Sequence, residues 1–98
     1  MADHLAHANW NLIPDYMQGG VRRWIEDGIA PGHFLTAVLC NDLKEACGRA
    51  DDENRVRLHD YVSFFYSYAP TGCWGSPDRF NDWMKAGGIN GLERQYAA

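Results

Sequence analysis

Two loops rich in glycine and proline, GIAPGH at residues 28–33 and APTGCWGSP at residues 69–77, divide this chain into helical segments. Glycine is typical of the end of a helix, while proline and serine are typical of its first positions. Each loop therefore predicts the end of one helix and the start of the next. If the helices between the loops run antiparallel, both loops lie at the same end of the molecule, where they form a candidate ligand site.

Outward from these loops, the spacing of apolar residues predicts four helices. They run over residues 14–27, about 33–47, 51 or 52 to about 68, and 77–86, where Gly87 and Gly88 stop the last one. The predicted fold class is all-α, a compact bundle of about four helices. We expect a single helical domain over residues 13–88, an N-terminal arm over residues 1–12 and a C-terminal tail over residues 89–98.

Composition excludes several classes of function. The chain has 98 residues, a formal net charge of −4 and 46% hydrophobic residues, so it can build one core. No block of basic residues is present, which argues against direct nucleic-acid binding, because such binding needs clustered Lys and Arg to neutralise phosphates. No apolar run reaches the ~20 residues that cross a bilayer, so we expect no membrane partner.

The N-terminus and the cysteines indicate a cellular location. The first residues lack a basic stretch followed by an apolar run, so no signal peptide is expected. The three cysteines form no CxxC motif, and an odd number favours free thiols in a reducing compartment. We therefore expect a cytoplasmic protein.

A candidate ligand site combines residues of the two loops. His33, Thr71, Trp74, Ser76 and Arg79 offer a titratable donor, a hydroxyl, a stacking ring, a second hydroxyl and a cation. Together with the free N–H groups at two helix starts, this set fits a nucleotide-like or other anionic ligand. The alternative is structural: Ser76 caps its helix, Trp74 closes the end of the bundle and Arg79 is solvated.

The sequence predicts no metal site, no cofactor and no catalytic set. His33, Cys40 and Cys47 share one helix face, but seven helical residues rise about 10.5 Å, which is too far for one tetrahedral site. His4 and His7 supply only two ligands. No sequence motif of a known catalytic class is present. We therefore expect a protein that is not an enzyme.

Aromatic side chains form the candidate protein-interaction surface. Tyr66 lies away from the centre of the apolar face of its predicted helix, and Trp10 lies in the N-terminal arm. With Trp74 they make a set of rings that favours a protein partner or self-association if they are exposed. The alternative is that all three pack onto the bundle.

Three segments resemble a family of small uncharacterised proteins of bacteriophages and prophages. They are GIAPGHFLTAVLCNDLKEA at residues 28–46, GRAD at residues 48–51 and CWGSP at residues 73–77. The resemblance covers roughly residues 12–88 and carries no catalytic residue. It implies an accessory protein of a phage, a group whose members often bind and disable a host factor, including antiviral defences.

The leading hypothesis is a non-enzymatic phage accessory protein that binds and inhibits a host protein, as a counter-defence protein would. A second hypothesis is a small-molecule binder that sequesters a nucleotide-like ligand between the two loops. A third is a structural or virion-associated subunit whose function is to form a homo-oligomer. The three differ in the partner they require: a host protein, a small anion or a second copy of the chain.

Overall fold

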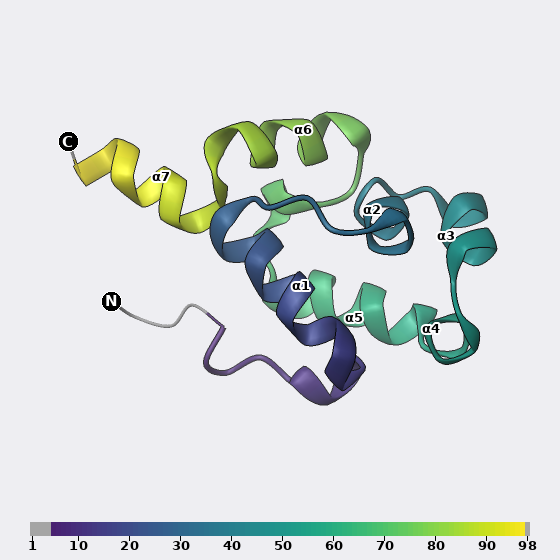
Figure 1. The fold of residues 1–98 in the computed structure, drawn as a ribbon. Helices are drawn as coiled ribbons and strands as arrows, with labels where there is room; N and C mark the ends of the chain where they lie inside the picture. The colour runs from purple at the N-terminus through teal and green to yellow at the C-terminus, as the bar shows by residue number, and fades with distance from the viewer. Residues whose placement is uncertain (1–4, 98) are drawn as a thin grey trace.

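The computed structural model describes residues 5–97, and in that range the chain is helical with no strand (Figure 1). The all-α prediction is confirmed. The elements in order are η1 (Trp10–Leu12), α1 (Asp15–Asp27), α2 (His33–Leu39), α3 (Leu43–Arg49), α4 (Asp52–Val56), α5 (Leu58–Tyr68), η2 (Thr71–Cys73), α6 (Pro77–Ala86) and α7 (Gly88–Ala97). Figure 1 shows α7 projecting at one end of the molecule, and α3 with α4 at the other.

The described residues form seven α-helices in place of the predicted four, because two predicted helices are each broken in two and the predicted tail forms α7. The predicted helix over 33–47 ends at Leu39, and Asn41 then adopts a left-handed conformation with φ of 60°. Asp42 starts the next helix, since its Oδ1 accepts a hydrogen bond from the Glu45 N–H at 3.1 Å. Gly48, predicted as a helix end, lies within α3.

The predicted helix over 51–68 breaks at Arg57, between α4 and α5. Arg57 has φ of −108° and ψ of 8°, which does not continue a regular α-helix. Asp51, one of the two positions predicted to start this helix, caps α4, because its Oδ1 accepts a hydrogen bond from the Asn54 N–H at 2.8 Å.

The segment predicted as a C-terminal tail is mostly helix α7. Gly87 and Gly88 both have positive φ, 81° and 72°, and they turn the chain sharply after α6. A Cβ atom on Gly88 would lie 2.5 Å from the backbone of Glu26 and Asp27, so only glycine allows this close approach to α1. Asn90 Nδ2 also donates a hydrogen bond to Asp27 Oδ1 at 2.9 Å, which ties α7 to the end of α1.

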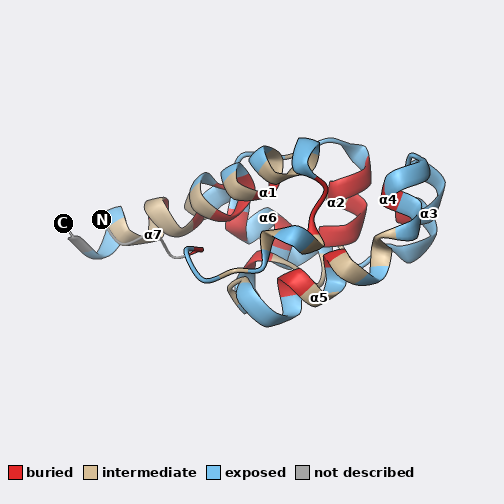
Figure 2. Cartoon of the chain, turned by 90° about the horizontal axis from the view of Figure 1, so that it is seen from below, coloured by how far each residue is buried: buried red, intermediate tan, exposed pale blue. Residues whose placement is uncertain are grey.

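The core is centred on Trp24, whose side chain is completely buried. Its ring stacks on Phe80 with 4.5 Å between centroids. The Trp24 Nε1–H donates to the Cys73 carbonyl, and the Trp83 Nε1–H donates to the Trp24 carbonyl, each at 3.0 Å. Figure 2 shows buried residues concentrated on the sides of the helices that face one another. The buried rings pack together, and both indole N–H groups have hydrogen-bond acceptors, so α1, η2 and α6 form one block.

The segment predicted as an N-terminal arm contributes to this core from Leu5 onwards. Leu5 is buried, and Leu12 packs against the core. This segment contains the short helix η1, and the Trp10 Nε1–H in it donates to the Leu5 carbonyl at 3.3 Å. His4, which was considered as a metal ligand, lies outside the described residues. No helix in residues 5–97 combines the length and apolar character needed to cross a membrane.

Candidate functional site

The two glycine- and proline-rich loops contact different elements of the fold. The Gly75 N–H donates to the Leu39 carbonyl at 2.7 Å, which places the second loop at the C-terminal end of α2. In the first loop, a Cβ on Gly28 would lie 2.9 Å from the Gly88 nitrogen and the Trp83 carbonyl oxygen, at the far end of α6. Because the predicted second helix ends early at Leu39, the chain does not follow the simple up-down order that the prediction assumed.

Three of the five predicted ligand residues meet, in a cluster that closes the second loop. Arg79 Nη1 donates to the Thr71 carbonyl at 3.3 Å, and Ser76 Oγ accepts from the Arg79 N–H at 3.1 Å. Trp74 is half-buried and its ring lies 5.8 Å from that of Phe65. Ser76 caps α6, as the structural alternative expected, whereas Arg79, which that alternative left solvated, is exposed but binds the Thr71 carbonyl.

His33 lies apart from this cluster, at the N-terminal end of α2. It lines a hollow of about 180 Å³ together with Cys40, Asp42, Glu45 and Arg49. The pKa of the Cys40 thiol is raised, mainly by burial and secondly by the negative charge of Asp42. A raised pKa disfavours the reactive thiolate form. Glu45 Oε1 accepts a hydrogen bond from Arg49 Nε at 3.2 Å. Within residues 5–97, no group of three or more His, Cys, Asp or Glu is arranged to hold a metal ion.

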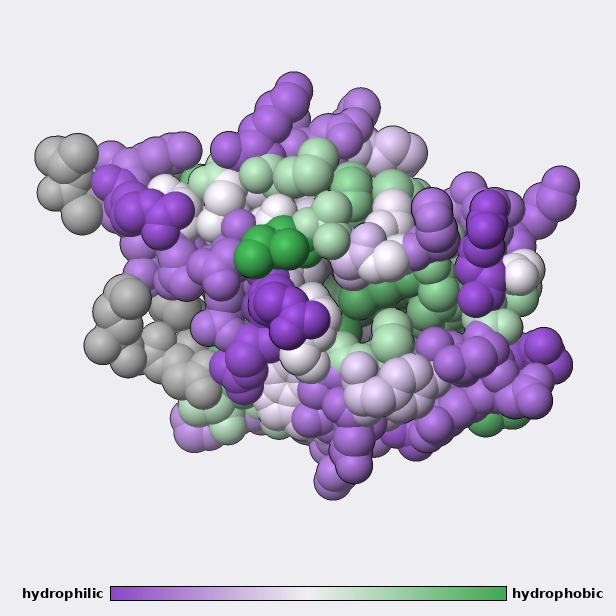
Figure 3. Space-filling view, viewed as in Figure 1, coloured by the Kyte–Doolittle hydropathy of each residue, from purple (hydrophilic) through white to green (hydrophobic). Residues whose placement is uncertain are grey.

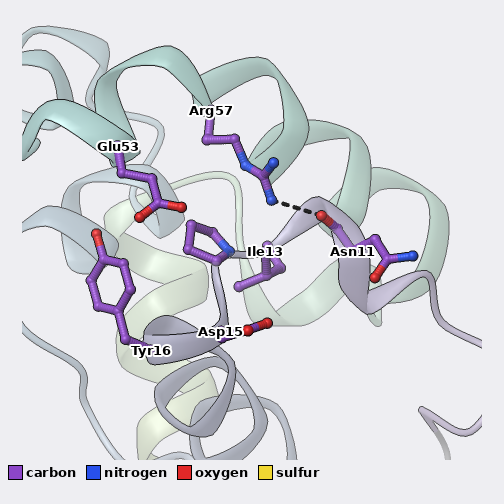
Figure 4. Close-up of a pocket in the computed structure, with 7 residues that line it drawn as sticks. Asn11, Ile13, Asp15, Tyr16, Glu53 and Arg57 are labelled. Atoms are coloured by element: carbon purple, nitrogen blue, oxygen red, sulfur yellow. Dashed lines mark hydrogen bonds between the residues drawn. The ribbon is translucent and has the colours of Figure 1, made fainter.

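A polar pocket of about 290 Å³ lies between the start of α1 and the α4–α5 junction (Figure 4). Figure 4 shows Arg57 and Glu53 on one side, and Tyr16 and Asp15 on the other. Arg57 Nη2 donates to the Asn11 carbonyl at 2.7 Å, so its guanidinium already serves the fold.

The same pocket is bordered by a hydrogen bond between α1 and the start of α4. The Tyr16 hydroxyl donates to Asp51 Oδ2 at 2.5 Å. That bond is the main cause that raises the pKa of Tyr16 to about 12, and it lowers the pKa of Asp51 below its usual value. The Tyr16–Asp51 and Arg57–Asn11 hydrogen bonds therefore join the η1–α1 segment to the α4–α5 segment beside this pocket.

An apolar groove lies between α2, α3 and α5. It has a volume of about 260 Å³. The residues that line it are Ala37, Val38, Asn41, Asp42, Leu43, Ala46, Leu58, His59 and Val62. Leu43 is 69% exposed and Val62 is 46% exposed, so both stand at the mouth of the groove. Two ionisable side chains, Asp42 and His59, belong to this lining.

Tyr66 follows Val62 by one helical turn on α5 and is 82% exposed. Residues four apart on a helix are neighbours on its surface, so Tyr66 extends the apolar surface beyond the groove. We call the groove together with Leu43, Val62 and Tyr66 the α2–α3–α5 face. Figure 3 shows a mostly hydrophilic surface on which hydrophobic residues gather in a central hollow.

Of the three rings predicted to meet a protein partner, Tyr66 alone is largely exposed. Trp10 packs on Phe64 with 4.8 Å between ring centroids, and the Arg22 guanidinium carbon lies 4.9 Å from the centre of the Trp10 ring. Trp10 and Trp74 therefore contribute to the core, as the alternative expected. Leu43 was missed because it was placed inside a continuous helix, although its spacing after Asn41 and Asp42 is that of a helix start.

Comparisons of the chain with protein-family models, with curated proteins and with solved structures give no match.

Proposed function

We propose that this protein is a non-enzymatic binding protein that recognises another protein through the α2–α3–α5 face. The observation that carries the proposal is the exposure of Leu43, Val62 and Tyr66 around an apolar groove. Exposed apolar side chains that gather in one place cost solvation free energy, and they are typical of surfaces that bind a partner. Tyrosine is also among the residues that contribute most to protein–protein binding.

The size of the groove supports a protein partner over a small molecule. Its volume of about 260 Å³ lies below the roughly 300–1,000 Å³ of most small-molecule sites. The groove therefore suits one or two apolar side chains of a larger partner.

The resemblance to phage accessory proteins extends the proposal to the partner's origin. We take the partner to be a protein of the bacterial host, and the biological role to be inhibition of that protein, as in counter-defence. The polar pocket and the Thr71–Arg79 cluster support a nucleotide binder less well, because Tyr16, Arg57 and Arg79 already donate hydrogen bonds within the chain.

The proposal is tested by capture from a bacterial lysate with immobilised protein. The test variant carries Leu43→Glu and Tyr66→Ala, both on the α2–α3–α5 face. The matched control carries Val56→Glu and Tyr96→Ala, whose side chains are 78% and 87% exposed and do not line the groove. We expect a host protein that the wild type and the control retain and that the test variant loses.

Capture of the same proteins by all three forms would contradict the proposal, and so would the absence of any retained protein. Circular dichroism of each variant provides the check on folding. Because all four side chains are exposed, each substitution should change the free energy of unfolding by no more than about 0.5 kcal/mol.

A further inference from the structure

The carboxylate of Asp42 indicates which charge a group bound in the groove should carry. Asp42 lies at the turn between α2 and α3, and its Oδ1 accepts the hydrogen bond that caps α3. This bond holds the carboxylate at one end of the apolar lining. A carboxylate beside an apolar surface favours a cation next to the inserted group and disfavours an anion.

The basic side chains nearest to Asp42 in sequence lie outside the groove, and His59 of α5 is the other ionisable side chain in its lining. Lys44 and Arg49 belong to α3 but are absent from the lining of the groove. Arg49 also forms an ion pair with Glu45, with 3.2 Å between Arg49 Nε and Glu45 Oε1. The formal net charge of the whole chain is −4, which favours encounter with a basic surface.

The shape of the groove sets the size of the inserted group. Its lining comes from three helices, with Val38 from α2, Ala46 from α3 and Leu58 from α5. The small side chains of Ala37 and Ala46 leave the space that a larger apolar side chain from outside can fill. Such insertion of a single anchor is common in the recognition of helical segments by grooves.

We propose that the groove receives a large apolar side chain of the partner protein, next to a lysine or arginine of the partner that pairs with Asp42. This inference rests on the proposed function above and adds the chemistry of the partner segment. The apolar side chain fills the space between α2, α3 and α5. The basic group reaches the Asp42 carboxylate at the mouth.

The test uses three small probes with the same phenyl group: phenethylamine as a cation, 2-phenylethanol as a neutral compound and 3-phenylpropanoate as an anion. Each is titrated into the full chain while the methyl signals of Val38, Leu43, Leu58 and Val62 are followed by NMR. We expect all three probes to shift these signals. Phenethylamine should bind about two- to fivefold more tightly than 2-phenylethanol, as is usual for one partly solvated ion pair.

The charge requirement is tested by Asp42→Asn, because asparagine caps a helix as well as aspartate does. This variant should bind phenethylamine and 2-phenylethanol equally. The matched control is Asp82→Asn on α6, which changes the net charge by the same amount outside the groove. The control should keep the preference of the wild type for phenethylamine.

Three results would overturn the inference. The first is an absence of shifts at the methyl groups of the groove. The second is tighter binding of 3-phenylpropanoate than of phenethylamine. The third is self-association in sedimentation that Leu43→Glu abolishes, because a second copy of the chain would then fill the groove. If the probes do not bind but a host protein is captured, this inference is wrong and the proposed function stands. Binding of the probes without any captured protein removes the proposed function instead.

Discussion

The two ends of the molecule are stabilised in different ways. The block of α1, η2 and α6 buries Trp24, Phe80 and Trp83, and the polar atoms of both tryptophans are bound to backbone carbonyls. At the other end, α3 buries Ala46 alone and α4 buries Asn54 alone. The large aromatic core stabilises the first end, whereas helix caps and a few side-chain hydrogen bonds stabilise the second.

This difference has a consequence for binding. Regions with few buried apolar contacts open locally at lower free energy, and binding surfaces are often drawn from them. The α2–α3–α5 face borders the sparsely packed end, and Leu43 of α3 is exposed at its mouth. The face can therefore adjust to a partner while the aromatic block keeps its structure.

The largest expected effect is at the centre of the aromatic block. Trp24→Ala removes a fully buried ring together with its hydrogen bond to the Cys73 carbonyl. The free energy of unfolding should fall by about 3–5 kcal/mol, measured by urea denaturation. A loss below about 1 kcal/mol would show that this block does not dominate stability.

A smaller effect is expected at the sparsely packed end. The Tyr61 hydroxyl donates to Asn54 Oδ1 at 2.6 Å, and both side chains are buried. Tyr61→Phe keeps the ring but leaves the Asn54 oxygen without this donor, so it should cost about 1–3 kcal/mol in urea denaturation. Tyr66→Phe on the same helix is the control, because its side chain is exposed and the change should be close to neutral. If both variants changed the free energy of unfolding equally, the hydrogen bond from Tyr61 to Asn54 would not stabilise the fold.

A pH-dependent effect is expected where α1 meets α4. The pKa of Asp51 is lowered in the folded state, mainly by the Tyr16 hydroxyl, so its contribution to stability is present above about pH 4 and is lost as pH falls through the lowered pKa. The pKa of Tyr16 is raised to about 12, so the same bond persists until pH rises past about 10 and is lost towards 12.

Asp51→Asn tests this directly, because asparagine still caps α4 while the carboxylate is gone. The variant should be less stable than the wild type at pH 7, and the difference should shrink in acid, in urea titrations at several pH values. The pKa of Tyr16, followed by NMR of its ring carbons, should move back towards 10. An unchanged Tyr16 pKa in the variant would contradict the hydrogen bond.

The smallest effect on stability is expected on the α2–α3–α5 face. Leu43→Glu should change the free energy of unfolding by no more than about 0.5 kcal/mol, because the side chain is mostly exposed. Urea denaturation measures this, with Val56→Glu as the matched control on α4. A loss of several kcal/mol would show that Leu43 belongs to the core and not to a binding surface.

Local signals predicted the elements of the aromatic block well. Gly28 and Gly87 adopt left-handed conformations at the ends of α1 and α6, and Ser76 caps α6, as the sequence indicated. The break at Asn41 was missed although a signal was present. Asp42 followed three residues later by Glu45 is the pattern of a helix start, but the apolar run before it suggested a continuous helix.

The candidate site was harder to predict, because tertiary packing decides which side chains remain exposed. Trp10 and Tyr66 are both aromatic, yet Trp10 packs on Phe64 while Tyr66 points away from the core. Nothing within either segment distinguishes the two. The joining of α2, α3 and α5 into a groove depends on both helix breaks, so a prediction that missed the breaks could not contain the groove.

The most direct test of the central claim is photo-crosslinking in intact bacterial cells, with benzoylphenylalanine placed at one position at a time. Positions 43 and 66 report on the α2–α3–α5 face, while positions 16 and 96 carry exposed tyrosines elsewhere. We predict one discrete adduct with a host protein from positions 43 and 66 and none from positions 16 and 96. Adducts from positions 16 or 96 alone, or the same adducts from all four, would contradict the assignment of this face.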